Sequence, residues 1–220
     1  VIDFLPARQG GTARQLDART ASLDGLLIST DPPYYDNINY SDLSDFFYVW
    51  LRRCLRPVHP ALLSTMLVPK AEELVANPYR HGGREGAQDF FEGGFREVFA
   101  HARKSALPDF PITVYYAFKQ SETVDGDESS TGWETLLEGM LGSGWCVTAT
   151  WPLRSERGGR MLSVGTNALA SSIVLALRPR PDDAPRTDRR RFIAALKAEL
   201  PTALKELQQG AIAPVDLPQA

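Results

Sequence analysis

The spacing of hydrophobic positions along this chain predicts a mixed α/β fold. Apolar residues three or four positions apart predict helices over 43–55, 90–106, 133–141 and 190–207. Short runs rich in Val, Ile, Tyr and Trp predict strands over 26–29, 112–118, 145–151 and 173–177. The order strand, helix, helix, strand, helix, strand, strand is typical of a doubly wound α/β sheet that ends in an antiparallel pair of strands.

The helix predicted over 43–55 has the clearest apolar stripe. Ser41 or Asp42 can cap its start, and Pro57 ends it. We expect the stripe to face the core, with Trp50 packed beneath the segment that follows the first strand. Its members recur with helical spacing and are Leu43, Phe46, Phe47, Trp50, Leu51, Cys54 and Leu55.

Two polar stretches divide the chain. Residues 120–132 (QSETVDGDESSTG) form an acidic loop, and residues 178–188 (RPRPDDAPRTD) contain three prolines and have the composition of a linker. We therefore expect one body over 1–180, followed over 181–220 by a linker, a C-terminal helix and a tail. Pro201 lies inside the helical pattern and is expected to kink or split that helix.

Composition narrows the function classes. The 220 residues are 43% hydrophobic and 23% charged, which excludes a disordered or coiled-coil protein. A net charge of −3 gives no global attraction to nucleic acid, so any such contact needs a local basic patch. The two cysteines, Cys54 and Cys146, are far apart, which excludes a disulfide framework or a zinc ribbon and favours a reducing, cytoplasmic setting. We expect no membrane span and no metal site, because the apolar runs are short and the histidines isolated.

The segment after the first predicted strand carries the candidate chemistry. Asp31, Pro32, Pro33, Tyr34 and Tyr35 place a carboxylate, two rigid backbone positions and two phenols at the end of a strand, where α/β sheets bind ligands. A carboxylate beside fixed carbonyl oxygens accepts hydrogen bonds and suits a planar amine, and an aromatic ring offers it a stacking surface. The alternative interpretation is a tight turn with no ligand.

This motif resembles the DPPY motif of amino-group DNA methyltransferases, which use S-adenosylmethionine to methylate exocyclic amines of adenine or cytosine. The likeness is closest to the large adenine-specific DNA methylases that carry a further N-terminal region and a zinc ribbon, and it covers most of positions 10–180. The blocks that carry it are DPPYYDNINYSDLSDFFYVWLRR from Asp31, PKAEELVANPYRHGG from Pro69, Trp151-Pro152 and NALASS from Asn167.

The resemblance implies a role for each residue of the motif. Asp31 and the carbonyl of Pro32 accept the two hydrogen bonds of the target amine, Pro33 stiffens the segment, and Tyr34 stacks on a base flipped out of the DNA. Further substrate contacts are expected at Tyr35, Asn37, Tyr40, Arg154, Arg157 and Asn167. Cofactor contacts are expected at Thr12, Ala13 and Asp31.

The chain departs from this family in one respect that matters for the cofactor. No strand followed by a Gly-rich turn is found in the sequence, and that turn holds the methionine part of S-adenosylmethionine in class I methyltransferases. We therefore expect the chain to be a piece of a longer protein: the part of the Rossmann-like sheet from the DPPY strand through the terminal antiparallel strand pair. Its partners are then DNA and the missing N-terminal cofactor half, and its own cofactor site is incomplete.

Alternatives remain open at this level. The substrate amine can belong to cytosine, RNA or protein in place of adenine, although Asp at the first motif position favours adenine enzymes. A different class is a non-catalytic nucleic-acid-binding or defence-associated module that has kept the fold. The arginines at 52, 53 and 56 either stabilise the end of a helix dipole or contact phosphate.

Overall fold

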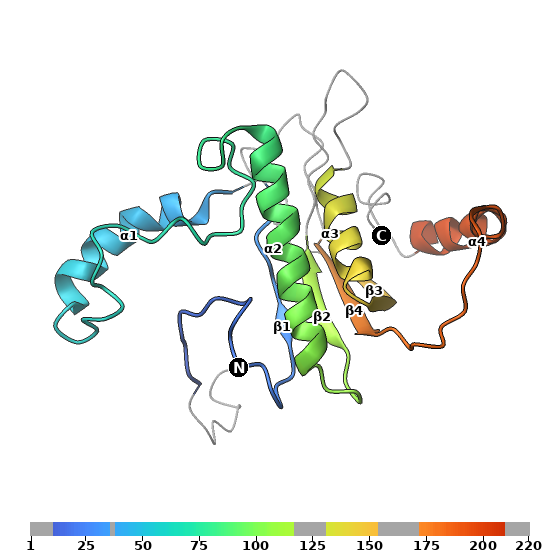
Figure 1. Ribbon diagram of the computed structural model, residues 1–220, viewed down its shortest axis with the longest axis horizontal. Coiled ribbons are helices and arrows are strands. Elements are labelled where there is room, and N and C mark those ends of the chain that lie inside the picture. Colours follow the sequence, from blue (N-terminus) through green and yellow to red (C-terminus); the bar gives the residue numbers. More distant parts are fainter. Residues whose placement is uncertain (1–10, 36–37, 117–130, 154–171, 210–220) are drawn as a thin grey trace.

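The structure is a computed structural model, and it describes residues 11–35, 38–116, 131–153 and 172–209. Within these ranges the chain is mixed α/β, with helices and strands alternating along most of its length (Figure 1). In chain order the elements are β1 (Ser29–Thr30), α1 (Tyr40–Leu55), α2 (Arg84–Ser105), β2 (Ile112–Tyr116), α3 (Thr131–Gly142), β3 (Trp145–Leu153), β4 (Ser172–Pro179) and α4 (Arg189–Gln209).

The strands form one mixed sheet in the order β1-β2-β4-β3. β1 pairs with β2 in parallel, so that Ser29 lies beside Thr113. The last strand, β4, lies between β2 and β3 and is antiparallel to both, which confirms the expected antiparallel ending. A register shift between Val147 and Ala149 breaks the alternation of β3, and this explains why Trp151 is exposed although the pattern placed it with Trp145.

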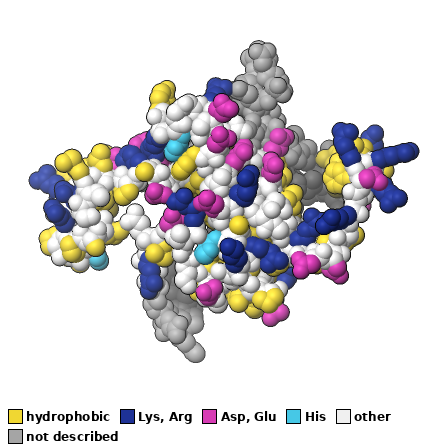
Figure 2. Space-filling view, in the orientation of Figure 1, with side chains coloured by type: hydrophobic (Ala, Val, Ile, Leu, Met, Phe, Trp, Pro, Cys, Tyr) yellow, Lys and Arg dark blue, Asp and Glu magenta, His cyan; other side chains and the backbone are white. Residues whose placement is uncertain are grey.

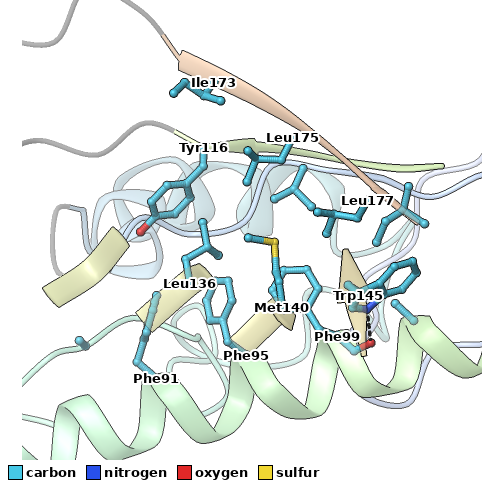
Figure 3. Close-up of a cluster of buried hydrophobic side chains, with 14 of the residues drawn as sticks. Phe91, Phe95, Phe99, Tyr116, Leu136, Met140, Trp145, Ile173, Leu175 and Leu177 are labelled. Atoms are coloured by element: carbon cyan, nitrogen blue, oxygen red, sulfur yellow. Dashed lines mark hydrogen bonds between the residues drawn. The ribbon is translucent and has the colours of Figure 1, made fainter. Parts of the chain in front are cut away.

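The core lies between this sheet and the helices α2 and α3, which pack side by side over one of its faces (Figures 1 and 3). Phe91, Phe95 and Phe99 recur every four residues along α2 and are buried, as the spacing predicts. Leu136 and Met140 of α3 meet them from the side, and β4 closes the core from above in Figure 3. Trp145 is fully buried, and its indole N–H donates a 2.9 Å hydrogen bond to the carbonyl oxygen of Phe99.

The expected doubly wound arrangement is not found among the described residues. α1 and α4 extend away from the sheet, leaving α2 and α3 as the helices that cover it in Figure 1. α4 continues through Pro201 as one helix, so the proline does not split it. No helix within the described ranges is long and apolar enough to cross a membrane.

The first strand is shorter than the sequence predicts. We expected a buried strand over 26–29, but β1 consists of Ser29 and Thr30, and Leu26 and Leu27 are 52% and 67% exposed. Ile28 does pack against the core, and its carbonyl accepts a hydrogen bond from the Thr113 N–H. Among the described residues, β1 has a neighbour on one side only.

The prediction for α1 is wrong about its buried face. The helix itself forms and ends before Pro57, but every member of the apolar stripe is exposed, with Trp50 at 60% and Phe46 at 68%. The local cap is also wrong, since Ser41 and Asp42 lie inside the helix and Asn39 occupies the N-cap position. The spacing identifies an amphipathic helix correctly but cannot say which surface its apolar side meets.

Candidate active site

The DPPY segment lies where two parallel strands end. Asp31 follows Thr30, the last residue of β1, and β1 and β2 run in the same direction. The segment therefore sits at the carboxyl edge of this pair, which is the edge at which open α/β sheets bind ligands. Its prolines are half-buried, whereas Asp31 is exposed.

A pocket of about 750 Å³ opens beside this segment. Asp31, Pro32 and Pro33 form part of its wall, and Tyr40 at the start of α1 forms another part. The chain between 15 and 19, the stretch from 68 to 74 and the core side of α2 complete it. The motif is thus next to a cavity large enough for a base or a nucleoside.

The charged groups of the pocket are mostly acidic. Four carboxylates, those of Asp17, Asp31, Glu72 and Glu73, line it together with one cation, Arg19. The guanidinium of Arg19 is already paired within the protein, because it contacts Asp17 at 2.8 Å and also forms an ion pair with Glu72. A pocket of this charge suits a ligand that donates hydrogen bonds or is cationic, and it disfavours a phosphate.

Asp31 differs from the other acids in its partners. Asp17 and Glu72 pair with Arg19, and Glu73 pairs with Arg80 at 2.8 Å. Within the described residues Asp31 makes no ion pair with Lys or Arg. Its partner there is a neutral group, the phenol of Tyr34, which hydrogen-bonds to the Asp31 carboxylate.

Two phenols surround the Asp31 carboxylate. Burial, together with the charge and hydrogen bonding of Asp31, raises the pKa of Tyr34 to about 12. Burial and the same charge raise the pKa of Tyr40. Both phenols consequently stay neutral at physiological pH and remain hydrogen-bond donors beside the acid.

The ring of Tyr34 lies on the core side of the motif. It packs edge-to-face on Tyr116 with ring centroids 5.2 Å apart, and its hydroxyl lies near Ser172 at the start of β4. Tyr34 does not line the pocket in this arrangement, whereas Tyr40 does. A stacking role for Tyr34 therefore needs a rotation of its side chain.

Tyr35 also turns toward the core. Its ring packs edge-to-face on Phe91 at 5.0 Å, and its carbonyl accepts a 2.9 Å hydrogen bond from the Ala76 N–H. The structure thus places Tyr35 where it anchors the motif, and not on the pocket wall where the resemblance puts a substrate contact.

A second anchor was not identified from the sequence. Glu73 accepts hydrogen bonds from both the backbone N–H and the hydroxyl of Ser41, and so caps α1 from a distant part of the chain. Burial opposes its ionisation, but these bonds and the Arg80 ion pair outweigh that cost and hold the pKa of Glu73 below its ordinary value. Asn77 donates to the side chain of Asn39 at 2.9 Å. The sequence feature that could have pointed to Glu73 and Asn77 is the stretch from Pro69, which carries part of the family resemblance but to which sequence analysis assigned no role.

The residues expected to hold S-adenosylmethionine do not make a complete site. Thr12 and Ala13 are exposed and do not line the pocket, although Leu16 a few residues later does. Of the three residues expected to contact the cofactor, Asp31 alone lies on the pocket wall.

Several expected site residues cannot be placed. Asn37, Arg154, Arg157 and Asn167 lie outside the described residues. Within the described ranges no group of three or more His, Cys, Asp or Glu side chains is arranged to hold a metal ion.

Comparison with protein-family models, with curated proteins and with solved structures finds no match to this chain. Function is therefore inferred from the residues of the site and from their resemblance to the DPPY motif.

Proposed function

We propose that this chain is the target-base half of an S-adenosylmethionine-dependent methyltransferase that acts on an exocyclic amine of a DNA base, most simply adenine. The observation that carries the proposal is the position of Asp31: an acid without an ion pair among the described residues, at the end of a parallel strand, on the wall of a cavity of about 750 Å³. The motif around it resembles the DPPY motif of such enzymes.

The chemistry of the wall agrees with an amine substrate. An exocyclic amine has two N–H donors, and the Asp31 carboxylate and the Pro32 carbonyl are acceptors one residue apart. Accepting both hydrogens draws the nitrogen lone pair out of conjugation with the ring and orients it for attack. Positioning of this kind supplies much of the rate without a strong base.

The cofactor supplies the methyl group, and it would be held chiefly by protein outside these residues. The residues of this chain bind and orient the amine. When the amine takes up the methyl group that the bound cofactor would supply, Asp31 or solvent would accept the surplus amine proton.

The topology of the described sheet is compatible with this proposal. A parallel pair β1–β2 followed by a strand that returns antiparallel between β2 and β3 agrees with the ending that the resemblance implies. In this arrangement β1 is an edge strand of the described sheet, so its free side is available to a strand of the cofactor half.

The test is to sequence methylated bases in DNA from cells that express the complete gene. We expect N-methylated adenine at a defined sequence, absent from cells with an empty vector. Unmodified DNA from cells that contain the folded protein, under conditions where a known methyltransferase marks the same host DNA, would contradict the proposal. Methylation of cytosine in place of adenine would change the substrate but keep the enzyme class.

A further inference from the structure

α1 is oriented with its polar side toward its own chain. Its least exposed residues are Ser41, Asp45, Tyr48 and Arg52, spaced by four, three and four positions, which places them on one side of the helix. The apolar stripe occupies the opposite side. We call this stripe the α1 face, with members Leu43, Phe46, Phe47, Trp50, Leu51, Cys54 and Leu55.

Polar contacts hold this orientation in place. Asp45 accepts hydrogen bonds from the Val68 N–H at 2.9 Å and from the Lys70 ammonium at 2.7 Å. The Tyr48 hydroxyl bonds to Thr65 at 2.8 Å, and Glu73 holds the Ser41 end of the helix. These polar contacts on the opposite side of α1 therefore keep the α1 face directed outward.

The α1 face is also unusually apolar for a surface. Leu43, Phe47 and Trp50 are 64%, 64% and 60% exposed. Figure 2 shows hydrophobic side chains gathered on the lobe that α1 forms, with Lys and Arg at its outer end. Contiguous apolar surface of this kind marks a site where another macromolecule binds.

We infer that the α1 face is the interface between two copies of this chain, which pack their α1 helices against each other in antiparallel orientation. A two-fold axis makes such a contact self-complementary, because each residue of the face meets the same face on the other copy. This inference does not depend on the proposed methyltransferase activity.

Charge favours the antiparallel arrangement. Asp42 and Arg53 lie on the same flank of the α1 face, eleven positions or about three turns apart. When two antiparallel helices cross near Phe47, Asp42 of one copy lies opposite Arg53 of the other, and the reverse holds as well. Asp42 already binds Arg80 at 2.6 Å, but its side chain is 49% exposed and a carboxylate can accept a second cation.

The size of the surface is also sufficient. At about 200 Å² for each large side chain and the observed exposures, the α1 face offers roughly 700 Å² per copy. Specific interfaces of standard size bury about 800 Å² on each partner. Aromatic residues at the centre of the face, here Phe47 and Trp50, are the type that dominates binding at such contacts.

Sedimentation of the purified 220-residue chain from 1 to 100 µM tests the inference. We expect a monomer–dimer equilibrium, and the Trp50→Glu variant should raise the dissociation constant by about 30-fold or more. The matched control is Phe192→Glu on α4, which adds the same charge at another exposed aromatic side chain, 57% exposed and outside α1, and it should leave the dimer intact. Circular dichroism of both variants establishes that they fold.

Three outcomes would overturn the inference. One is a wild-type chain that is monomeric at 100 µM. If the Trp50 fluorescence of such a monomer changes when duplex DNA is added, the α1 face is a nucleic-acid-binding surface. A second is a dimer that Trp50→Glu leaves unchanged. The third is efficient oxidation of Cys54 to a disulfide between copies, because the antiparallel arrangement keeps the two Cys54 residues about 20 Å apart.

Discussion

At the scale of single residues, Asp31 differs from the other acids of the pocket in its partners. Asp17, Glu72 and Glu73 each have a cationic partner that holds part of the chain together. Asp31 instead has the neutral phenols of Tyr34 and Tyr40 nearby. Its removal should therefore affect a ligand and not the fold.

Replacing Asp31 by Ala in the complete protein should abolish most methyl transfer while the thermal stability stays unchanged. Loss of one charge-assisted contact to the amine costs roughly 2 to 4 kcal/mol of transition-state stabilisation, or about 30- to 1000-fold in rate. Single-turnover kinetics on duplex DNA measures the effect. Asp17→Ala, which removes an acid of the same pocket, is the control and should cost far less in rate; equal losses would remove the special role of Asp31.

The pKa of Tyr34 gives a second test at this scale. Because the folded pKa of about 12 lies above the ordinary value of 10.0, the stabilisation of the neutral phenol is fully present below pH 10 and is lost as pH rises toward 12. Absorbance at 295 nm should show fewer tyrosines ionised at pH 11 in the folded chain than in the denatured chain, and Tyr34→Phe should reduce that difference by one tyrosine. A normal titration of Tyr34 would mean that its phenol is neither buried nor beside Asp31.

At the scale of elements, α1 is positioned by long-range contacts that local sequence patterns do not predict. α1 is joined to the body by the stretch from 68 to 80, and in particular by Glu73, which caps Ser41 across 32 positions of sequence. A local pattern predicts where a helix is and which side is apolar. It cannot supply the long-range partner that decides which side faces inward.

The Glu73→Ala substitution should destabilise the chain by about 1 to 3 kcal/mol, because it leaves the buried Ser41 N–H without an acceptor and removes one of the two carboxylates that pair with Arg80. Urea unfolding followed by circular dichroism measures the loss. Glu72→Ala is the matched control: that side chain is 70% exposed, and its surface ion pair with Arg19 is worth at most about 1 kcal/mol. Equal effects from the two variants would show that Glu73 does not hold α1.

Two aromatic residues that look alike in sequence should behave differently. Phe91 of α2 is fully buried, and Phe91→Ala should cost about 3 to 5 kcal/mol. Trp50 of α1 is 60% exposed, so Trp50→Ala should cost less than about 1 kcal/mol when measured at a dilution where the chain is monomeric. A large loss at Trp50 under those conditions would restore the original prediction that its helix face packs on the core.

The contrast between these two residues explains what the sequence could predict. The types and order of the eight elements within the described ranges follow from spacing, and so does the buried side of α2, because the sheet that covers it belongs to the same chain. The buried side of α1 does not, because its apolar side has no partner among the described residues. At the site, the position of Asp31 and Tyr40 on a pocket wall was predictable, whereas the inward turn of Tyr34 and Tyr35 depends on Tyr116 and Phe91 from distant elements.

At the scale of the whole molecule, the part of the sheet that the structure describes has two edges of unequal length. β3 at one edge is nine residues long, whereas β1 at the other has two residues and leads directly into the candidate site. An edge strand with unpaired backbone groups is a place where another strand can add. The proposed cofactor half would therefore pair with the free edge of β1, next to the candidate site.

If most cofactor contacts come from the proposed cofactor half, the 220-residue chain alone should bind S-adenosylmethionine too weakly to detect by calorimetry at millimolar cofactor. Of the expected contacts, Asp31 lines the cavity, while Thr12 and Ala13 do not. A ligand that touches one wall of its site cannot offset the translational and rotational freedom it loses on binding. The complete protein, measured in the same way, is the control and should bind. Micromolar binding by the isolated chain would mean that these residues form a cofactor site of a different kind, without the Gly-rich turn, and would make the pocket beside Asp31 the first place to look for it.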